Sequence, residues 1–485
     1  MTTFQQALHI FRKDVREFRI ELGVVFALTL FLVLANVQTW ENLQERGGFS
    51  LDDGEIFDVL LPLVWGLLIA RVIHAEALPG DRHFWLTRPY SRAGLILAKA
   101  LFIAAFVNLP LLVAQALIVS LDGLPLSAYI GSLLWNQVTV TAAFLVPIAA
   151  IASLTRNLAQ FLPVAVLATA LIAIPVAGER YLQEALQSVR ASIGTVFAGS
   201  VAGTVLFLQY RRRKTLRHAL YGALATFAGL VFYLSFPQSA AFAIQSKISG
   251  GRDAQFALKL GQPGQASLST TTPNRYRQLV ELPVLVEGVD PRNVRVDAPQ
   301  LTFRTLSGVM RRPWTETVIR QQGFAHIVAV EREFYDVARN SPVTVHAEYY
   351  LTQYGNEHAA EVPLDGTPVF IPGLGQCGTA PNYDRRLLMC RSAFRPPGSF
   401  LSAGVTDNRY HDGWSGPPIT ISPVKARTYE LAGREDINWI APEAPERPLQ
   451  IVSRELVAYL RYTLEVPNVR LSGYAIPEPK ENPEK

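Results

Sequence analysis

Long uncharged apolar runs alternate with short basic segments along the first half of this chain of 485 residues. The uncharged runs are residues 22–40, 100–121, 123–155, 157–178, 191–210 and 219–245, and a weaker run covers residues 56–74. A helix needs about 20 mainly apolar residues to cross the hydrocarbon layer of a bilayer. The core of a soluble protein would not contain so many such runs in succession, so this half predicts a bundle of membrane-spanning helices.

We therefore expect a transmembrane domain over residues 22–246. Its seven expected spans are residues 22–40, 56–74, 100–121, 127–150, 158–178, 191–210 and 219–238. None carries an acidic or basic residue near its centre, which argues against a carrier coupled to protons or ions.

A few polar residues lie inside the expected spans. They are Asn108, Gln115, Asn136 and Gln137. Such groups either line a path through the membrane or pair with one another between helices. Gly199 and Gly203 form a GxxxG pair, which permits close contact between two helices.

Lysine and arginine are distributed unevenly between the two sets of loops. The N-terminal segment and the second, fourth and sixth loops contain Arg12, Lys13, Arg16, Arg19, Arg71, Arg82, Arg88, Arg92, Lys99, Arg156, Arg211, Arg212, Arg213, Lys214 and Arg217. The alternate loops contain only Arg46, Arg180 and Arg190. Basic loops remain in the cytoplasm, so we expect a multi-pass protein of the cell (inner) membrane, with a cytoplasmic N-terminus and an extracytoplasmic C-terminal half.

The segment before the first span has a helical apolar stripe. The stripe consists of Phe4, Leu8, Phe11, Val15, Phe18 and Leu22. Since the basic residues lie largely off it, residues 1–21 are expected to form an amphipathic helix in the membrane interface. The alternative is a plain extension of the first span.

The second half of the chain is typical of a β-rich, water-exposed domain. A Gln/Ser/Thr/Gly/Pro-rich connector is expected at residues 247–274, and apolar and polar residues then alternate, most clearly over residues 343–352 and 460–466. This alternation predicts antiparallel strands in a β-sandwich over residues 275–475. A second division near residue 366 is weakly marked, and residues 476–485 are expected to be a flexible tail.

The chain has two cysteines, Cys377 and Cys390, both in the half assigned to the outside. That compartment is usually oxidising, so we expect them to form a disulfide. The alternative is two separate buried thiols.

No motif for catalysis appears in this sequence. HExxH, GxSxG and the phosphate-binding GxxxxGK[ST] are absent, and the histidines of the second half lie far apart. We expect no catalytic residue, no metal and no cofactor in this chain. Most of the formal net charge of +5 belongs to the membrane half, and no basic face with interleaved aromatics predicts binding to nucleic acid.

The loop between the second and third spans is basic and has aromatic membrane anchors. Ser91 can cap the helix that enters the third span. The loop resembles the cytoplasmic segment of the ABC-2 type permease family, which has the form E…G…FWLxRPxSR…K. The matching residues are Glu76, Gly80, Phe84, Trp85, Leu86, Arg88, Pro89, Ser91, Arg92 and Lys99. Lys13 and Asp14 also look like part of that family's entry helix. The alternative is a plain positive-inside loop.

The resemblance implies a transport function. It implies a membrane permease subunit that couples to a separate cytoplasmic ABC ATPase, pairs with a second permease subunit as a homodimer or heterodimer, and exports its substrate. The loop would contact the ATPase. The alternative is a non-transporting multi-pass anchor that displays a β-rich binding domain outside the membrane.

Overall fold

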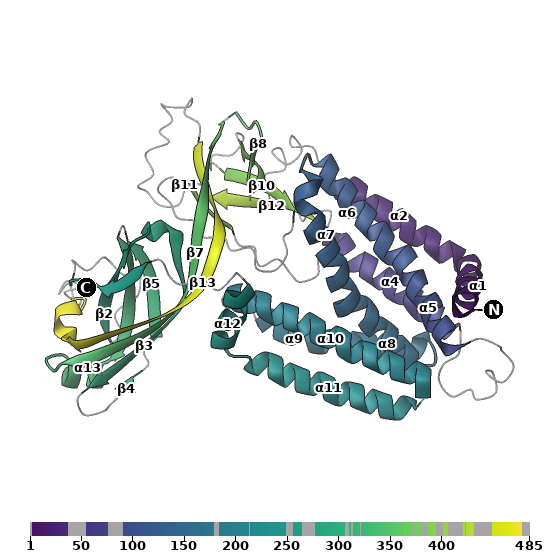
Figure 1. Ribbon diagram of the computed structural model, residues 1–485, viewed down its shortest axis with the longest axis horizontal. Helices are drawn as coiled ribbons and strands as arrows, with labels where there is room; N and C mark the ends of the chain where they lie inside the picture. The colour runs from purple at the N-terminus through teal and green to yellow at the C-terminus, as the bar shows by residue number, and fades with distance from the viewer. Residues whose placement is uncertain are drawn as a thin grey trace, which may run out of the picture. The chain divides into compact units, whose positions relative to one another are not determined.

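The computed structural model describes most of the chain (Figure 1). It describes residues 2–36, 55–75, 91–178, 184–212, 214–248, 256–263, 277–305, 310–311, 314–320, 322–363, 365–372, 374–380, 387–393, 401–405, 421, 423–430 and 449–477. The chain folds into two compact units. The helical unit comprises Met1–Phe236 and Glu357–Ser453, and the second unit comprises Pro237–Asn356 and Arg454–Lys485. No boundary between the units lies at residue 366, where a division was expected. Residues 357–453 group with the helices.

The helix α1 (Thr3–Glu17) precedes the predicted spans, and helices lie at all seven span positions. These are α2 (Arg19–Asn36), α4 (Glu55–His74), α5 (Arg92–Ile103), α6 (Leu109–Leu121), α7 (Leu126–Val140), α8 (Val146–Leu154), α9 (Leu158–Gly178), α10 (Glu184–Arg212) and α11 (Thr215–Ser235). The π-helical turn Ala104–Asn108 joins α5 to α6, and the π-helical turn Thr141–Leu145 joins α7 to α8.

Five helices among the described residues are long and apolar enough to cross a membrane. They are Arg19–Asn36, Arg92–Leu121, Leu126–Leu154, Ser192–Arg212 and Thr215–Ser235. The apolar stretches Val59–His74 and Leu158–Leu171 are shorter. A multi-pass membrane protein is therefore supported, whereas the predicted count of seven crossings is not confirmed.

The outward faces of these helices are apolar. On α11, Leu216 is 85% exposed and Phe227 is 66% exposed. A soluble protein seldom leaves so many large apolar side chains uncovered, whereas lipid chains solvate them readily.

Close packing of α10 depends on Gly199. A Cβ atom at Gly199 would lie 2.9 Å from Cβ of Ala142, in the second π-helical turn, whereas one at Gly203 would meet nothing nearer than 4.0 Å. The close helix contact predicted from the GxxxG pair therefore occurs, and Gly199 is the residue that requires it.

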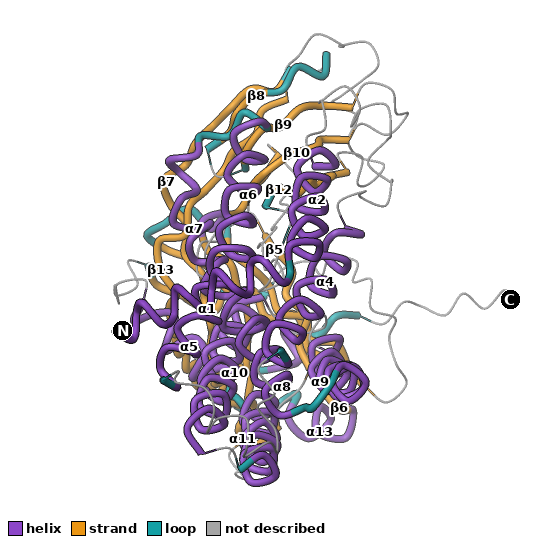
Figure 2. The backbone as a smooth tube through the Cα atoms, turned by 90° about the vertical axis from the view of Figure 1, so that its right-hand side faces the viewer, coloured by secondary structure: helices purple, strands orange, loops and turns teal. Residues whose placement is uncertain are grey.

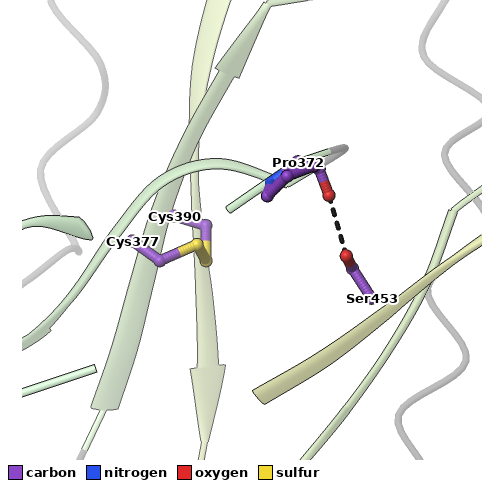
Figure 3. Close-up of a disulfide and its surroundings, with 4 residues drawn as sticks. All are labelled: Pro372, Cys377, Cys390 and Ser453. Atoms are coloured by element: carbon purple, nitrogen blue, oxygen red, sulfur yellow. Dashed lines mark hydrogen bonds between the residues drawn. A yellow bond between two sulfur atoms is a disulfide. The ribbon is translucent and has the colours of Figure 1, made fainter. Parts of the chain in front are cut away.

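A small antiparallel sheet belongs to the helical unit. It contains β8 (Val369–Ile371), β9 (Gly375–Ala380), β10 (Leu387–Ala393) and β12 (Val424–Glu430) in the order β12-β10-β9-β8. Cys377 and Cys390 lie directly opposite each other on β9 and β10 and form a disulfide (Figure 3). Nearby, Ser453 Oγ donates a 2.8 Å hydrogen bond to the carbonyl oxygen of Pro372.

The second unit is built on two sheets. One has the order β1-β2-β6-β5, and the other, β11-β13-β7-β3-β4, draws on strands that run through both units. The bounds are β1 (Ala257–Leu260), β2 (Arg277–Glu287), β3 (Val294–Thr305), β4 (Met310–Arg311), β5 (Trp314–Arg320), β6 (Gly323–Glu331), β7 (Val343–Val362), β11 (Leu401–Val405) and β13 (Leu449–Val469), with helices α12 (Gln238–Ile248) and α13 (Arg332–Ala338). Side chains of both sheets share one hydrophobic core. The alternation predicted over residues 343–352 is seen in β7, where Val343, Val345 and Ala347 are buried.

His326 of β6 is buried in this core. Its ring stacks on Tyr349 with the centroids 5.4 Å apart, and Nδ1 lies 3.1 Å from Thr317 Oγ1. Burial lowers the pKa of His326 from 6.5 to about 3. The folded unit therefore holds His326 neutral over the range in which the unfolded chain takes up a proton.

This difference predicts a loss of stability in acid. Because the pKa of His326 is about 6.5 in the unfolded chain and about 3 in the folded chain, acidification favours the unfolded state between these values. The free energy of unfolding should fall by about 1.4 kcal/mol for each pH unit across that window. Thermal unfolding of the full chain in detergent at pH 7 and pH 5 measures this. His326→Gln should flatten the pH dependence. Equal pH dependence in the parent protein and this variant would contradict the predicted role of His326.

Candidate functional site

Three contacts gather the basic segments at one end of the helical unit. The backbone N–H of Ser91 donates to Gln6 Oε1 over 3.0 Å, which joins the start of α5 to α1. His74 Nε2, at the end of α4, lies 3.1 Å from Thr155 Oγ1, just after α8. Arg92 Nη1 donates to the carbonyl oxygen of Arg211, near the end of α10, over 2.5 Å. The N-terminal helix and three basic loop stems therefore lie together, at what we call the basic end.

The helix α1 packs against α5 through a buried ion pair. Lys99 Nζ lies 2.7 Å from Asp14 Oδ2, and the two side chains are 5% and 0% exposed. Phe11 stacks on Phe106 with the ring centroids 5.7 Å apart, and Phe18 meets Phe102 edge-on. Lys99, expected at the ATPase-coupling loop, is thus turned inward onto α1.

The buried face of α1 is wider than the predicted stripe. Phe11 and Val15 of the stripe pack against the core, whereas Phe4 is 60% exposed. Ala7, Ile10 and Asp14 are also buried, and Asp14 pairs with Lys99, a contact that apolar spacing does not encode. The helix ends before Phe18 and a separate helix begins at Arg19, so α1 is not a continuous extension of α2.

The helix ends that flank residues 76–90 are stabilised by side-chain contacts. At the end of α4, Arg71 forms an ion pair with Glu21, and its guanidinium lies 5.7 Å from the ring centroid of Phe18. At the start of α5, the Ser91 side chain accepts a 3.1 Å hydrogen bond from the backbone N–H of Gly94, which confirms the predicted cap.

We call this set of contacts the basal junction. It consists of Gln6, Asp14, Glu21, Arg71, His74, Ser91, Arg92, Lys99, Thr155 and Arg211. The other predicted coupling residues, Glu76, Gly80, Phe84, Trp85, Arg88 and Pro89, lie outside the described residues. The junction links α1, α2 and α10 to the ends of α4 and α5 that flank residues 76–90.

Polar residues within the bundle pair with one another between helices. Gln115 Oε1 accepts hydrogen bonds from Gln137 Nε2 at 3.1 Å and from Asn136 Nδ2 at 3.4 Å. Asn108 Nδ2 donates to Thr141 Oγ1 at 3.0 Å, which links the two π-helical turns. Of the two predictions for these groups, the structure supports interhelical pairing.

The small sheet is joined to the end of the bundle opposite the basic end, and both views place β10 beside the ends of α2 and α6 (Figures 1 and 2). Arg391 Nη2 on β10 lies 2.6 Å from Asp122 Oδ1, at the C-cap of α6, and 3.4 Å from the carbonyl oxygen of Asn36. Burial raises the pKa of Asp122 to about 6, and the Arg391 guanidinium opposes that shift. At neutral pH the carboxyl is therefore mostly ionised and the pair is charged.

Sequence reasoning did not single out Arg391 or Asp122. Asp122 does interrupt two uncharged runs, which is a signal that it needs a partner, but nothing local identifies an arginine far along the chain. Among the described residues, no group of three or more His, Cys, Asp or Glu is arranged to hold a metal ion. Comparison with protein families, with curated proteins and with solved structures found no match.

The buried pair predicts a strong asymmetry between single and double variants. Lys99→Met removes the cation that pairs with the buried Asp14 carboxylate, so it should cost about 3–5 kcal/mol of unfolding free energy. Adding Asp14→Leu removes that charge and should restore most of the loss. Thermal unfolding in detergent, with Lys13→Met as the exposed neighbouring control, checks this. A double variant less stable than Lys99→Met would contradict the account.

Proposed function

We propose that this chain is the membrane permease subunit of an ABC-2 type transporter, coupled to a separate ATPase and working as an exporter. The observation that carries this proposal is the basal junction. Residues 76–92 resemble the family's cytoplasmic segment, and the helix ends on both sides of residues 76–90 are bonded to neighbouring helices. An element that transmits force from a partner needs such fixed ends.

The proposed orientation of the protein in the membrane follows from the charge of the loops. With the basic end in the cytoplasm, the small sheet and its disulfide lie on the extracytoplasmic side, where disulfides persist. Seven spans fit this arrangement, since both the N-terminus and the basic loops are then inside. The β-rich half would form an extracytoplasmic sandwich, and a second permease subunit would complete the transporter.

A non-transporting anchor is the second candidate. It is favoured by the small sheet, which the buried Arg391–Asp122 pair joins to the bundle, because a protein that displays a domain needs such an attachment. The two candidates differ in the partner, since only the transporter needs an ATPase at the basic end.

Copurification with an ATPase distinguishes them. The full chain, purified in mild detergent from its native membrane, should bring an ABC ATPase with it. Arg88→Glu should weaken this association by about 2–5 kcal/mol, the cost of removing one partner of a buried charge pair at an interface. Arg82→Glu makes the same charge change in the same loop outside the family pattern, and serves as the matched control.

Expression and membrane insertion should be unchanged in both variants. An ATPase retained equally by Arg88→Glu and Glu76→Lys would mean that the loop is only a positive-inside anchor. The absence of any ATPase from the parent protein would favour the second candidate.

A further inference from the structure

A late segment of the chain reaches into the helical bundle at the end opposite the basic end. Gln115 lies more than one turn before α6 ends at Leu121, and it is fully buried. Its Nε2 donates a 2.9 Å hydrogen bond to the backbone carbonyl oxygen of Ile421. Ile421 and Val424 belong to the same hydrophobic core as the membrane helices.

Irregular backbone is tolerated at such depth only where protein surrounds it. The Ile421 carbonyl meets this condition because Gln115 satisfies it, and Gln115 is in turn held by Asn136 and Gln137. The side-chain amides of Gln115, Asn136 and Gln137 therefore form a polar site, and the backbone carbonyl of Ile421 occupies it.

A charged contact holds the strand next to this segment, because β10 pairs with β12, which begins at Val424. Arg391 of β10 is 6% exposed and pairs with Asp122 at the end of α6. The disulfide to Cys377 is made by Cys390, the residue next to Arg391. The strand that carries the arginine is thus covalently tied to β9.

We propose that β9, β10, Ile421 and Val424 form a removable plug in the bundle. Ile421 occupies the amide site of Gln115, Asn136 and Gln137, and the Arg391–Asp122 pair is the latch that keeps it seated. Withdrawal of the plug exposes the side-chain amide of Gln115 in apolar surroundings. Gln115 lies about two helical turns after Asn108, which belongs to a π-helical turn. Such turns occur frequently at functional sites.

The latch is an ion pair, and this favours reversible binding of the plug to the bundle. A buried ion pair gives little net stability over apolar packing, because both ions lose their hydration. When the plug leaves the bundle, Arg391 and Asp122 are hydrated again. A contact held by this ion pair therefore separates more easily than one held by apolar packing alone. The plug closes the bundle whether or not an ATPase binds at the basic end.

A cysteine in the amide site reports plug withdrawal. Asn136→Cys places a thiol at a position that is 5% exposed, in a chain whose own two cysteines are joined in a disulfide. The full-length protein in lipid nanodiscs is treated with a small charged methanethiosulfonate. Labelling should be slow with the latch intact and faster by about tenfold or more when Arg391→Gln is added, because the seated state then keeps the Asp122 carboxylate buried without its arginine, which costs far more than the intact pair contributes.

Two further variants test whether the effect is specific to the Arg391–Asp122 pair. Asp122→Asn breaks the latch from the other side and should give the same acceleration, even if Arg391→Gln folds poorly. Arg190→Gln removes another buried arginine, which donates to the carbonyl oxygen of Phe236 at the end of α11, and should leave the labelling rate unchanged. Fast labelling of the latched parent, slow labelling after both latch substitutions, or equal acceleration by Arg190→Gln would overturn the plug.

Discussion

Lipid offers no hydrogen-bond partner to a buried polar group, so polar side chains in the helical unit are stabilised by partners within the protein. The contacts that define the unit follow this constraint. Asp14 is paired with Lys99, Asn108 with Thr141, and Gln115 with two side-chain amides and the Ile421 carbonyl. Because each pair joins different helices, or a helix and the backbone at Ile421, satisfying polar groups also determines how these elements pack.

The continuous helix from α5 through α6 connects the two ends of the unit. At one end, Ser91, Arg92 and Lys99 tie it to α1 and α10. Toward the other end it carries Gln115, and Asp122 caps it there. The basal junction and the plug are thus attached to one helix, which passes through a π-helical turn between them.

Local patterns predicted the parts of this structure that depend on local forces. Apolar runs placed the helices, alternation placed β7, and Ser91 capped α5 because a hydroxyl is suited to the N–H groups of a first turn. Pairings between residues far apart in the sequence produce no local pattern of this kind. Asp14 and Lys99 are 85 residues apart, and Asp122 and Arg391 are 269 apart. For the same reason the sequence did not indicate that residues 357–453 belong with the helices, since strand patterning continues on both sides of Asn356.

The side of the membrane that each end of the helical unit occupies is measured directly by labelling intact cells. His9 is exposed on α1 at the basic end, and Ala359 is exposed on β7 in the part of the helical unit that contains the small sheet. With a membrane-impermeant maleimide, Ala359→Cys should react in intact cells, whereas His9→Cys should react only after lysis. The reverse pattern, or labelling of both positions before lysis, would contradict the proposed cytoplasmic junction and extracytoplasmic plug.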